Sequence, residues 1–218
     1  MVAELLDIKE IVEIQKSGDI AKAKELYQEL LTEDKNNIEA TYNLASIYKN
    51  EKDFQSALEL YKQVIALNPN HVLSYIQIGK ILQQKKNFEQ AHKIFEMALS
   101  IDENNTDTLF EIHSNYLHQN EFEKSHKILQ KLVIVDKDNP NVYRAFGNLY
   151  TLEKNYYDAI ASYLKVSELQ SDDAINYIKL SLAYKALGHT NEAVAYYKQA
   201  VELDSNLLNV DRELKEKI

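Results

Sequence analysis

The chain has 218 residues, of which 45% are hydrophobic and 27% are charged, and its net charge is −9. This composition is typical of a foldable chain, and the negative charge argues against general nucleic-acid binding, which requires a surplus of Lys and Arg. The absence of Cys excludes disulfides and cysteine-ligated metals, and the four Gly and two Pro favour long helices.

The N-terminal residues 1–14 lack a basic segment followed by a long apolar run, so no signal peptide is predicted. No stretch approaches the roughly 18 uninterrupted apolar residues that predict a membrane span. Together with the absence of Cys, these features favour a cytoplasmic protein that is not inserted in a membrane.

Helical spacing of apolar and small residues runs through 41–69 and is interrupted once, near residue 52, which predicts a helical hairpin. The spacing recurs with a period of 34 residues, so six units are predicted: 4–37, 38–71, 72–105, 106–139, 140–173 and 174–207. Residues 208–218 follow as a predicted C-terminal capping helix, with one apolar face formed by Leu207, Val210, Leu214 and Ile218.

Three positions of the unit carry the pattern most clearly. Small residues at positions 8 and 20 allow the two helices of a hairpin to approach closely, and a bulky residue at position 24 fills the space around that contact. Asp, Asn and Ser between units are expected to cap the helices that follow. The residues concerned are Ala45, Gly79, Gly147 and Ser181 at position 8; Ala23, Ala57, Ala91, Ser125, Ala159 and Ala193 at position 20; and Tyr27, Tyr61, Phe95, Leu129, Tyr163 and Tyr197 at position 24.

This set resembles the tetratricopeptide repeat (TPR), and the resemblance covers residues 4–207. The chain departs from the TPR pattern in lacking Trp at position 4 and in keeping the Pro of position 32 only at Pro69. The resemblance implies an all-α fold, a right-handed superhelical solenoid of antiparallel helix hairpins.

No catalytic motif is found, because the glycines are isolated and the six His lack metal-ligand spacing. We therefore expect a protein that is not an enzyme and has no cofactor and no metal. His113 occupies position 8 of the fourth unit, where a small residue is expected, and it is predicted to meet Ser125 at the hairpin contact. The alternative is a locally loosened repeat with a functional bend.

Twelve of the fifteen Tyr fall at core positions of the repeat, which makes a structural role the simplest interpretation. Only Tyr42, Tyr157 and Tyr196 lie off the core pattern.

The resemblance implies that the first helices of the hairpins line a concave groove that binds peptides. Its predicted groove residues are Tyr42, Asn43, Ser46, Lys49, Ile76, Gln77, Lys80, Phe110, Ser114, Arg144, Asn148, Ile178, Lys179 and Leu182.

Charge is distributed unevenly between the groove positions and the rest of the chain. The resemblance implies that positions 2, 5, 6, 9, 12 and 13 of every unit point into the groove. These positions carry seven cations and three carboxylates: Lys9, Lys16, Lys49, Lys80, Arg144, Lys179 and Lys185 against Glu39, Asp107 and Glu111. Their net charge is +4, so the remainder of the chain carries −13. A positive face favours an acidic or amphipathic partner. Some TPR co-chaperones read a C-terminal carboxylate with a clamp of basic and Asn residues. That clamp is incomplete here, although Arg144, Asn148 and Lys179 are retained as a candidate anion pocket.

The sequence is thus interpreted as a protein-interaction scaffold or adaptor that binds a protein or peptide partner. Two alternatives stay open. The first is a self-assembling scaffold, paired as a homo-oligomer through an apolar end such as Leu5, Ile8 and Val12. The second is a targeting domain from a larger enzyme.

Overall fold

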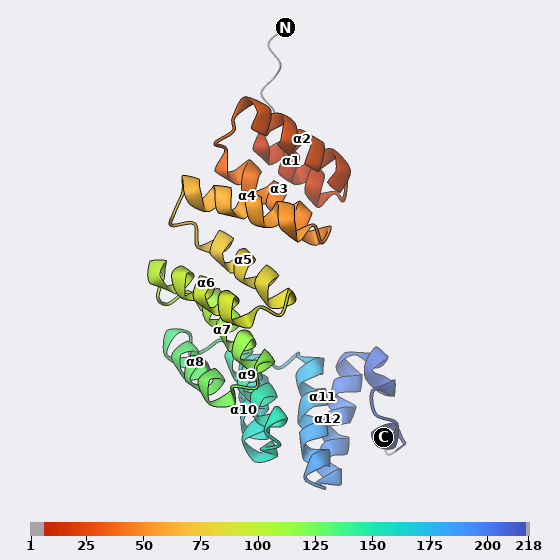
Figure 1. The fold of residues 1–218 in the computed structure, drawn as a ribbon. Helices are drawn as coiled ribbons and strands as arrows, with labels where there is room; N and C mark the ends of the chain where they lie inside the picture. Colours follow the sequence, from red (N-terminus) through yellow and green to blue (C-terminus); the bar gives the residue numbers. More distant parts are fainter. Residues whose placement is uncertain (1–6, 217–218) are drawn as a thin grey trace. The chain divides into compact units, whose positions relative to one another are not determined.

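The structure is a computed structural model that describes residues 7–216. Within these residues the chain is all-helical, and no described helix is both long and apolar enough to cross a membrane. The helices are connected by short turns (Figure 1): α1 (Ile8–Lys16), α2 (Ile20–Glu33), α3 (Ile38–Asn50), α4 (Phe54–Leu67), α5 (Val72–Gln84), α6 (Phe88–Ile101), α7 (Thr106–His118), α8 (Phe122–Val135), α9 (Pro140–Leu152), α10 (Tyr156–Leu169), α11 (Ala174–Ala186), α12 (Thr190–Leu203), the 3-10 helix η1 (Ser205–Asn209) and α13 (Arg212–Lys215).

The helices keep the period seen in the sequence. From α3 onward, the first helices of successive hairpins begin 34 residues apart, at Ile38, Val72, Thr106, Pro140 and Ala174, and the second helices follow the same step. The helices of a hairpin pack together, as α3 does with α4 and α9 with α10. Second helices also pack on the first helix of the next hairpin, as α2 does on α3, α4 on α5, α8 on α9 and α10 on α11. The predicted all-α fold of helix hairpins is therefore confirmed.

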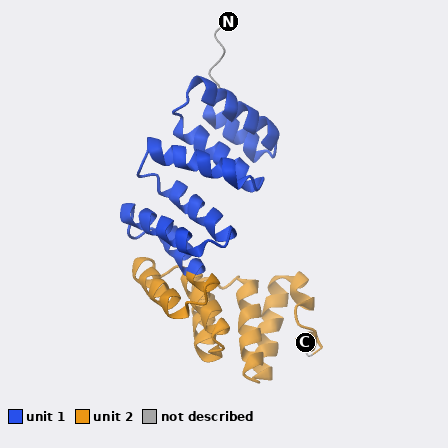
Figure 2. Ribbon diagram, in the orientation of Figure 1, with its two compact units in different colours: residues 1–115 blue, residues 116–218 orange. Residues whose placement is uncertain are grey.

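The chain divides into two compact units, coloured separately in Figure 2: an N-terminal unit of residues 1–115 and a C-terminal unit of residues 116–218. The periodicity of the sequence does not indicate this division. Its boundary lies inside α7, two residues after His113. Both His113 and Ser125 are buried, as their predicted contact requires, but the contact itself stays a prediction.

Small residues on the first helix of a hairpin make room for an aromatic ring on the second. A Cβ built on Gly79 would lie 2.2 Å from the Phe95 ring, and one built on Gly147 would lie 2.3 Å from the Tyr163 ring. Both rings are fully or almost fully buried, so neither can swing aside. Position 8 is therefore small because the ring at position 24 occupies the space of a side chain.

The predicted polar caps are present, with one correction. Side chains of Asn37, Asn139 and Asp173 accept hydrogen bonds from the first amides of α3, α9 and α11. The segment 68–70 does not cap α5, because His71 does so: its Nδ1 accepts from the backbone amide of Ser74 at 3.3 Å and lies 2.9 Å from the Ser74 hydroxyl.

The turn inside each hairpin has one residue in the left-handed region. Gly18 and Gly188 have φ of 97° and 78°, where glycine is free of steric cost. The same turns in the other hairpins place a residue with a side chain there, with φ between 57° and 63°: Lys52, Lys86, Asn120 and Lys154. The left-handed turn is thus kept even in hairpins that have no glycine at this position.

The C-terminal segment differs from the single capping helix predicted over 208–218. It forms η1 and the short α13, separated by a break at Val210 and Asp211, and Ile218 lies outside the described residues. Leu214 is buried in the core of the C-terminal unit, whereas Val210 is exposed. The break arises where the Tyr197 hydroxyl contacts the chain, 2.7 Å from the Leu208 carbonyl oxygen and 3.4 Å from the Asp211 amide. That this segment caps the array stays a prediction.

The close approach at Gly79 predicts a specific coupling. Replacing Gly79 with Ala should lower the free energy of unfolding by about 1–2 kcal/mol, because crowding against Phe95 outweighs the roughly 1 kcal/mol that Ala gains in a helix. In a Phe95→Leu background the cost of Gly79→Ala should shrink, because the added methyl then has room. Urea unfolding of the two single variants and the double variant measures this coupling, and an equal cost in both backgrounds would contradict it.

The His71 cap predicts a pH dependence of stability. Burial lowers the pKa of His71 below its unfolded value near 6.5. Its stabilising contribution is therefore complete above pH 6.5 and is lost as the pH falls through the folded pKa, when Nδ1 gains a proton and can no longer accept. His71→Asn retains an accepting side chain that does not titrate, so it should lose about 1 kcal/mol less than the wild type between pH 7.5 and 5. Parallel urea titrations at the two pH values test this, and an identical decline would show that the cap does not titrate.

Candidate binding site on the first helices

In the N-terminal unit, several predicted groove residues take part in packing. Ile76 is only 4% exposed and belongs to the core, so its assignment to the groove is corrected. Tyr42 is half-buried, with its ring centroid 5.5 Å from that of Tyr61 and 5.1 Å from that of His71. Asn43, Ser46, Phe110 and Ser114 are each half-buried.

Polar side chains of this unit form two contacts between neighbouring first helices. Lys49 on α3 donates to the Gln77 amide oxygen on α5 at 2.7 Å, and Lys80 on α5 pairs with Glu111 on α7 at 2.6 Å. Burial, and then the nearby Lys80, lower the pKa of Lys49. The two lysines therefore differ, since Lys80 has a carboxylate partner and Lys49 has a neutral amide.

In the C-terminal unit, Arg144 on α9 is committed to an internal ion pair. Its guanidinium lies 2.6 Å from the Asp173 carboxylate, and both side chains are largely buried. Asn141 and Gln170 also accept hydrogen bonds from it. Asp173 in turn caps α11. Arg144 thus connects α9 to the start of α11. Because its charge is already paired with Asp173, less of it is available to a ligand than the sequence indicates.

Lys179 on α11 lies beside this pair but has a different partner. Its ammonium donates to Asn148 Oδ1 at 2.6 Å, and the same oxygen accepts from the Tyr163 hydroxyl at 3.0 Å. Burial, and then the positive charge of Arg144, lower the pKa of Lys179, while Asp173 acts in the opposite direction. No carboxylate lies within ion-pair distance of Lys179 among the described residues.

A pocket of about 260 Å³ opens next to Lys179. Leu182 contributes an apolar surface that is 42% exposed, and the Tyr156 and Tyr163 rings supply aromatic walls. Ile178 is only 7% exposed and belongs to the core, so its assignment to the groove is corrected too. The complete lining is Thr151, Tyr156, Tyr163, Lys179, Leu182, Ala183 and Ala186.

The net charge assigned to the groove from sequence is also corrected. Four of its seven cations pair with carboxylates: Lys16 with Glu13, Lys80 with Glu111, Arg144 with Asp173, and Lys185 with Asp211 and Glu213. Four of these five carboxylates lie outside the positions counted for the groove: Glu13, Asp173, Asp211 and Glu213. Lys49 and Lys179 are the half-buried cations that retain an amide partner.

The contrast between Arg144 and Lys179 predicts opposite responses to removal of charge. Arg144→Met leaves the largely buried Asp173 carboxylate without its counter-charge and should lower the free energy of unfolding by about 1–2 kcal/mol. Lys179→Met removes an ammonium that burial already disfavours, and should leave stability unchanged or slightly higher. Urea denaturation followed by circular dichroism compares them. Equal destabilisation by both substitutions would argue against the assignment of Lys179 as the less satisfied cation.

The chain matches a family model and many solved structures. The family model described as "Cilia and flagella-associated protein 70 middle TPR-like domain" matches residues 11–204. A search of curated protein sequences found no match.

Three solved structures illustrate the similarity. PilW, a widely conserved type IV pilus biogenesis factor, has a TM-score of 0.78 and 18% identity, over 96% of this chain and 95% of its own. YrrB, a TPR protein with an unusual peptide-binding site, has a TM-score of 0.60 and 17% identity, over 88% of this chain and 96% of its own. A chain of the APC/C hetero-tetramer Cut9-Hcn1 has a TM-score of 0.71 and 15% identity, over 96% of this chain and 41% of its own. These structures show the fold, and the match of the family model over 11–204 shows that the chain belongs to the family of the cilia and flagella-associated protein 70 middle TPR-like domain.

Proposed function

We propose that the chain is a non-enzymatic scaffold that binds an acidic or amphipathic segment of a partner protein on the faces of its first helices. The TPR-like family and the peptide-binding site named for YrrB support a role in protein binding. The site that supports it best within this chain is the pocket beside Lys179 in the C-terminal unit.

The observation that carries the proposal is the partner of Lys179. A half-buried ammonium is costly unless it is paired, and here it is bonded to an amide oxygen. A carboxylate from a bound peptide would supply the counter-charge and form a charge-assisted hydrogen bond. An apolar side chain next to that carboxylate would fill the pocket against Leu182 and Tyr156. An acidic residue adjacent to an apolar one is therefore the preferred ligand.

The ammonium is held in place before a ligand arrives. Tyr163 is anchored in the core and its hydroxyl orients Asn148, which in turn fixes Lys179. Because the donor is already ordered, binding loses little side-chain entropy. Lys49 and Gln77 repeat this ammonium–amide pairing in the N-terminal unit and are proposed as a second contact point for a partner.

The self-assembly alternative rests on an apolar end that the structure describes only in part. Leu5 lies outside the described residues. Ile8 packs against the core cluster of the N-terminal unit, and Val12 is half-buried. No observation in the described residues favours self-assembly over peptide binding. Light scattering over a range of concentrations would detect such association.

The peptide site is tested with two fluorescein-labelled peptide pools. One has the pattern Gly-X-Glu-X-Glu-X-Gly, with X an equal mixture of Leu, Phe and Ala, and the other has Gln in place of Glu. Fluorescence anisotropy should show preference for the Glu pool, and Lys179→Met should weaken binding of that pool about tenfold, the loss expected for a charged hydrogen bond. The effect on the Gln pool should be small.

Lys165→Met is the matched control, because it removes the same charge from α10 of the same unit at an exposed pair with Glu168. It should leave affinity within about twofold of the wild type, as expected for a surface ion pair away from the ligand. Equal affinity of Lys179→Met and wild type for the Glu pool would overturn the proposed site.

A further inference from the structure

A row of aromatic rings lies on the last two long helices of the C-terminal unit, α11 and α12. The Tyr196 ring is nearly parallel to that of Tyr184, with centroids 5.4 Å apart and planes inclined by 10°, and to that of Tyr177, at 6.2 Å and 13°. His189 extends the row beyond Tyr184, at 6.2 Å. Tyr196 does not occupy a core position of the repeat, so its place in this row is not explained by the repeat itself.

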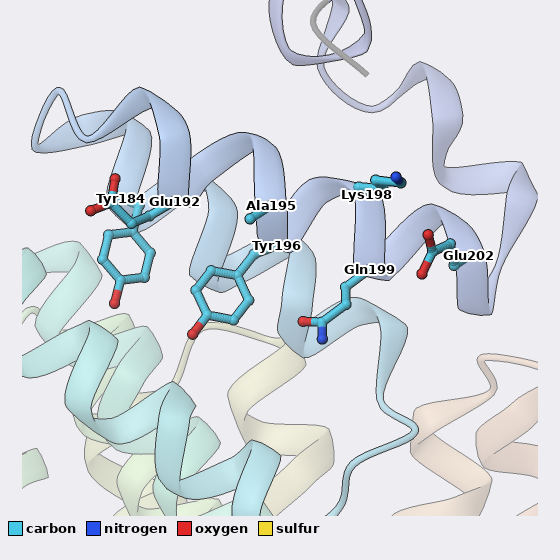
Figure 3. Close-up of a pocket in the computed structure, with 7 residues that line it drawn as sticks. All are labelled: Tyr184, Glu192, Ala195, Tyr196, Lys198, Gln199 and Glu202. Atoms are coloured by element: carbon cyan, nitrogen blue, oxygen red, sulfur yellow. The ribbon is translucent and has the colours of Figure 1, made fainter.

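A pocket of about 550 Å³ opens over part of this row (Figure 3). Tyr184 and Tyr196 lie side by side there with their hydroxyls pointing in the same direction, and Gln199 extends beside Tyr196. Burial raises the pKa of Tyr196, as do the neighbouring tyrosines, so its ring is a neutral phenol at pH 7. The complete lining is Tyr184, Glu192, Ala195, Tyr196, Lys198, Gln199 and Glu202.

The charges of the pocket are predominantly negative. Glu192 and Glu202 are exposed, and neither has an ion-pair partner among the described residues. The ammonium of Lys198 points away from both rings in Figure 3. The pocket therefore combines aromatic surface with two carboxylates and one ammonium, so its lining carries a net charge of −1.

We propose that this pocket, formed by Tyr184, Tyr196, Glu192 and Glu202, binds an arginine side chain of a protein partner. A guanidinium is planar and stacks on aromatic faces, and its positive charge is attracted by the π-electrons of the rings. Its N–H groups are donors only, which suits carboxylates and the amide oxygen of Gln199. A lysine ammonium shares the charge but not the planar shape, so arginine fits the two rings better.

This site is distinct from the pocket beside Lys179. The two pockets share no lining residue, and they present opposite charges. The site therefore goes beyond the proposed function, and either site can fail without the other. A partner that uses both would carry an acidic segment and, separately, an exposed arginine.

The test uses the peptide Ac-Gly-Gly-Arg-Gly-Gly-NH2 and its counterpart with citrulline, which has the shape of arginine without its charge. The full chain, labelled with ¹³C in its tyrosine rings, is titrated with each peptide and followed by NMR. The arginine peptide should shift the Tyr184 and Tyr196 ring signals saturably, and should leave the signal of Tyr157, an exposed tyrosine outside the pocket, in place. Equal shifts with citrulline, or equal shifts at Tyr157, would overturn the proposal.

Two variants with a matched control separate this site from general attraction to an acidic protein. Glu192→Gln with Glu202→Gln should weaken binding of the arginine peptide roughly threefold to tenfold, as expected when two exposed negative charges at the pocket are removed. Glu123→Gln with Asp172→Asn changes the net charge equally at exposed positions of the same unit outside the pocket, and should leave affinity within about twofold. Tyr196→Leu should remove the saturable shift at Tyr184 while circular dichroism shows retained helicity. Equal weakening by the two charge-altered variants would overturn the proposal.

Discussion

The close approach of two helices over an aromatic ring is the contact on which the rest of this structure depends. Gly79 and Gly147 leave space that the rings of Phe95 and Tyr163 fill completely. Since interiors are packed as densely as organic crystals, such a contact fixes the separation and the register of both helices. In the C-terminal unit the same contact also has a chemical consequence. The hydroxyl of Tyr163 donates to Asn148 Oδ1, and the same oxygen accepts from Lys179. One ring therefore takes part both in the packing of the hairpin and in the placement of the ammonium that we propose binds a ligand.

Most of the fold could be predicted from local residue patterns in the sequence. The small residues at position 8 and the aromatic residues at position 24 are recognised from residue type alone, and they predict the hairpins and their period. The His71 cap is different in kind, because His is a rare cap and its role depends on which ring nitrogen faces the Ser74 amide. The break near Asp211 was also not visible, since the apolar spacing around Leu214 is compatible with one continuous helix. The Tyr197 hydroxyl contacts the segment at this break, and it comes from a different helix.

The sequence indicates which helices carry the residues of the candidate site, but not the partners of their charges, and the role of these residues in binding stays a proposal. Because the helix period is regular, repeat position places Lys49, Asn148, Lys179 and Leu182 on first helices, as the structure has them. The same procedure does not see partners that come from outside the face, and Asp173 is such a partner for Arg144. Nor does it distinguish an apolar residue that is exposed from one that a neighbouring helix covers, as Ile178 shows. The aromatic pocket had one signal in the sequence, which was that Tyr196 does not fit the core pattern.

The left-handed turns have a consequence for how such a chain can change over time. Lys52, Lys86 and Lys154 hold a backbone conformation that costs a residue with a side chain on the order of 1 kcal/mol. All three are exposed, so their side chains contribute nothing to the cores. A change to glycine at any of these turns alters the stability of one hairpin while the cores and both pockets keep their residues. Substitutions at these turns can thus change the stability of one hairpin at a time. Selection can therefore act on the rigidity of each hairpin independently of what the chain binds.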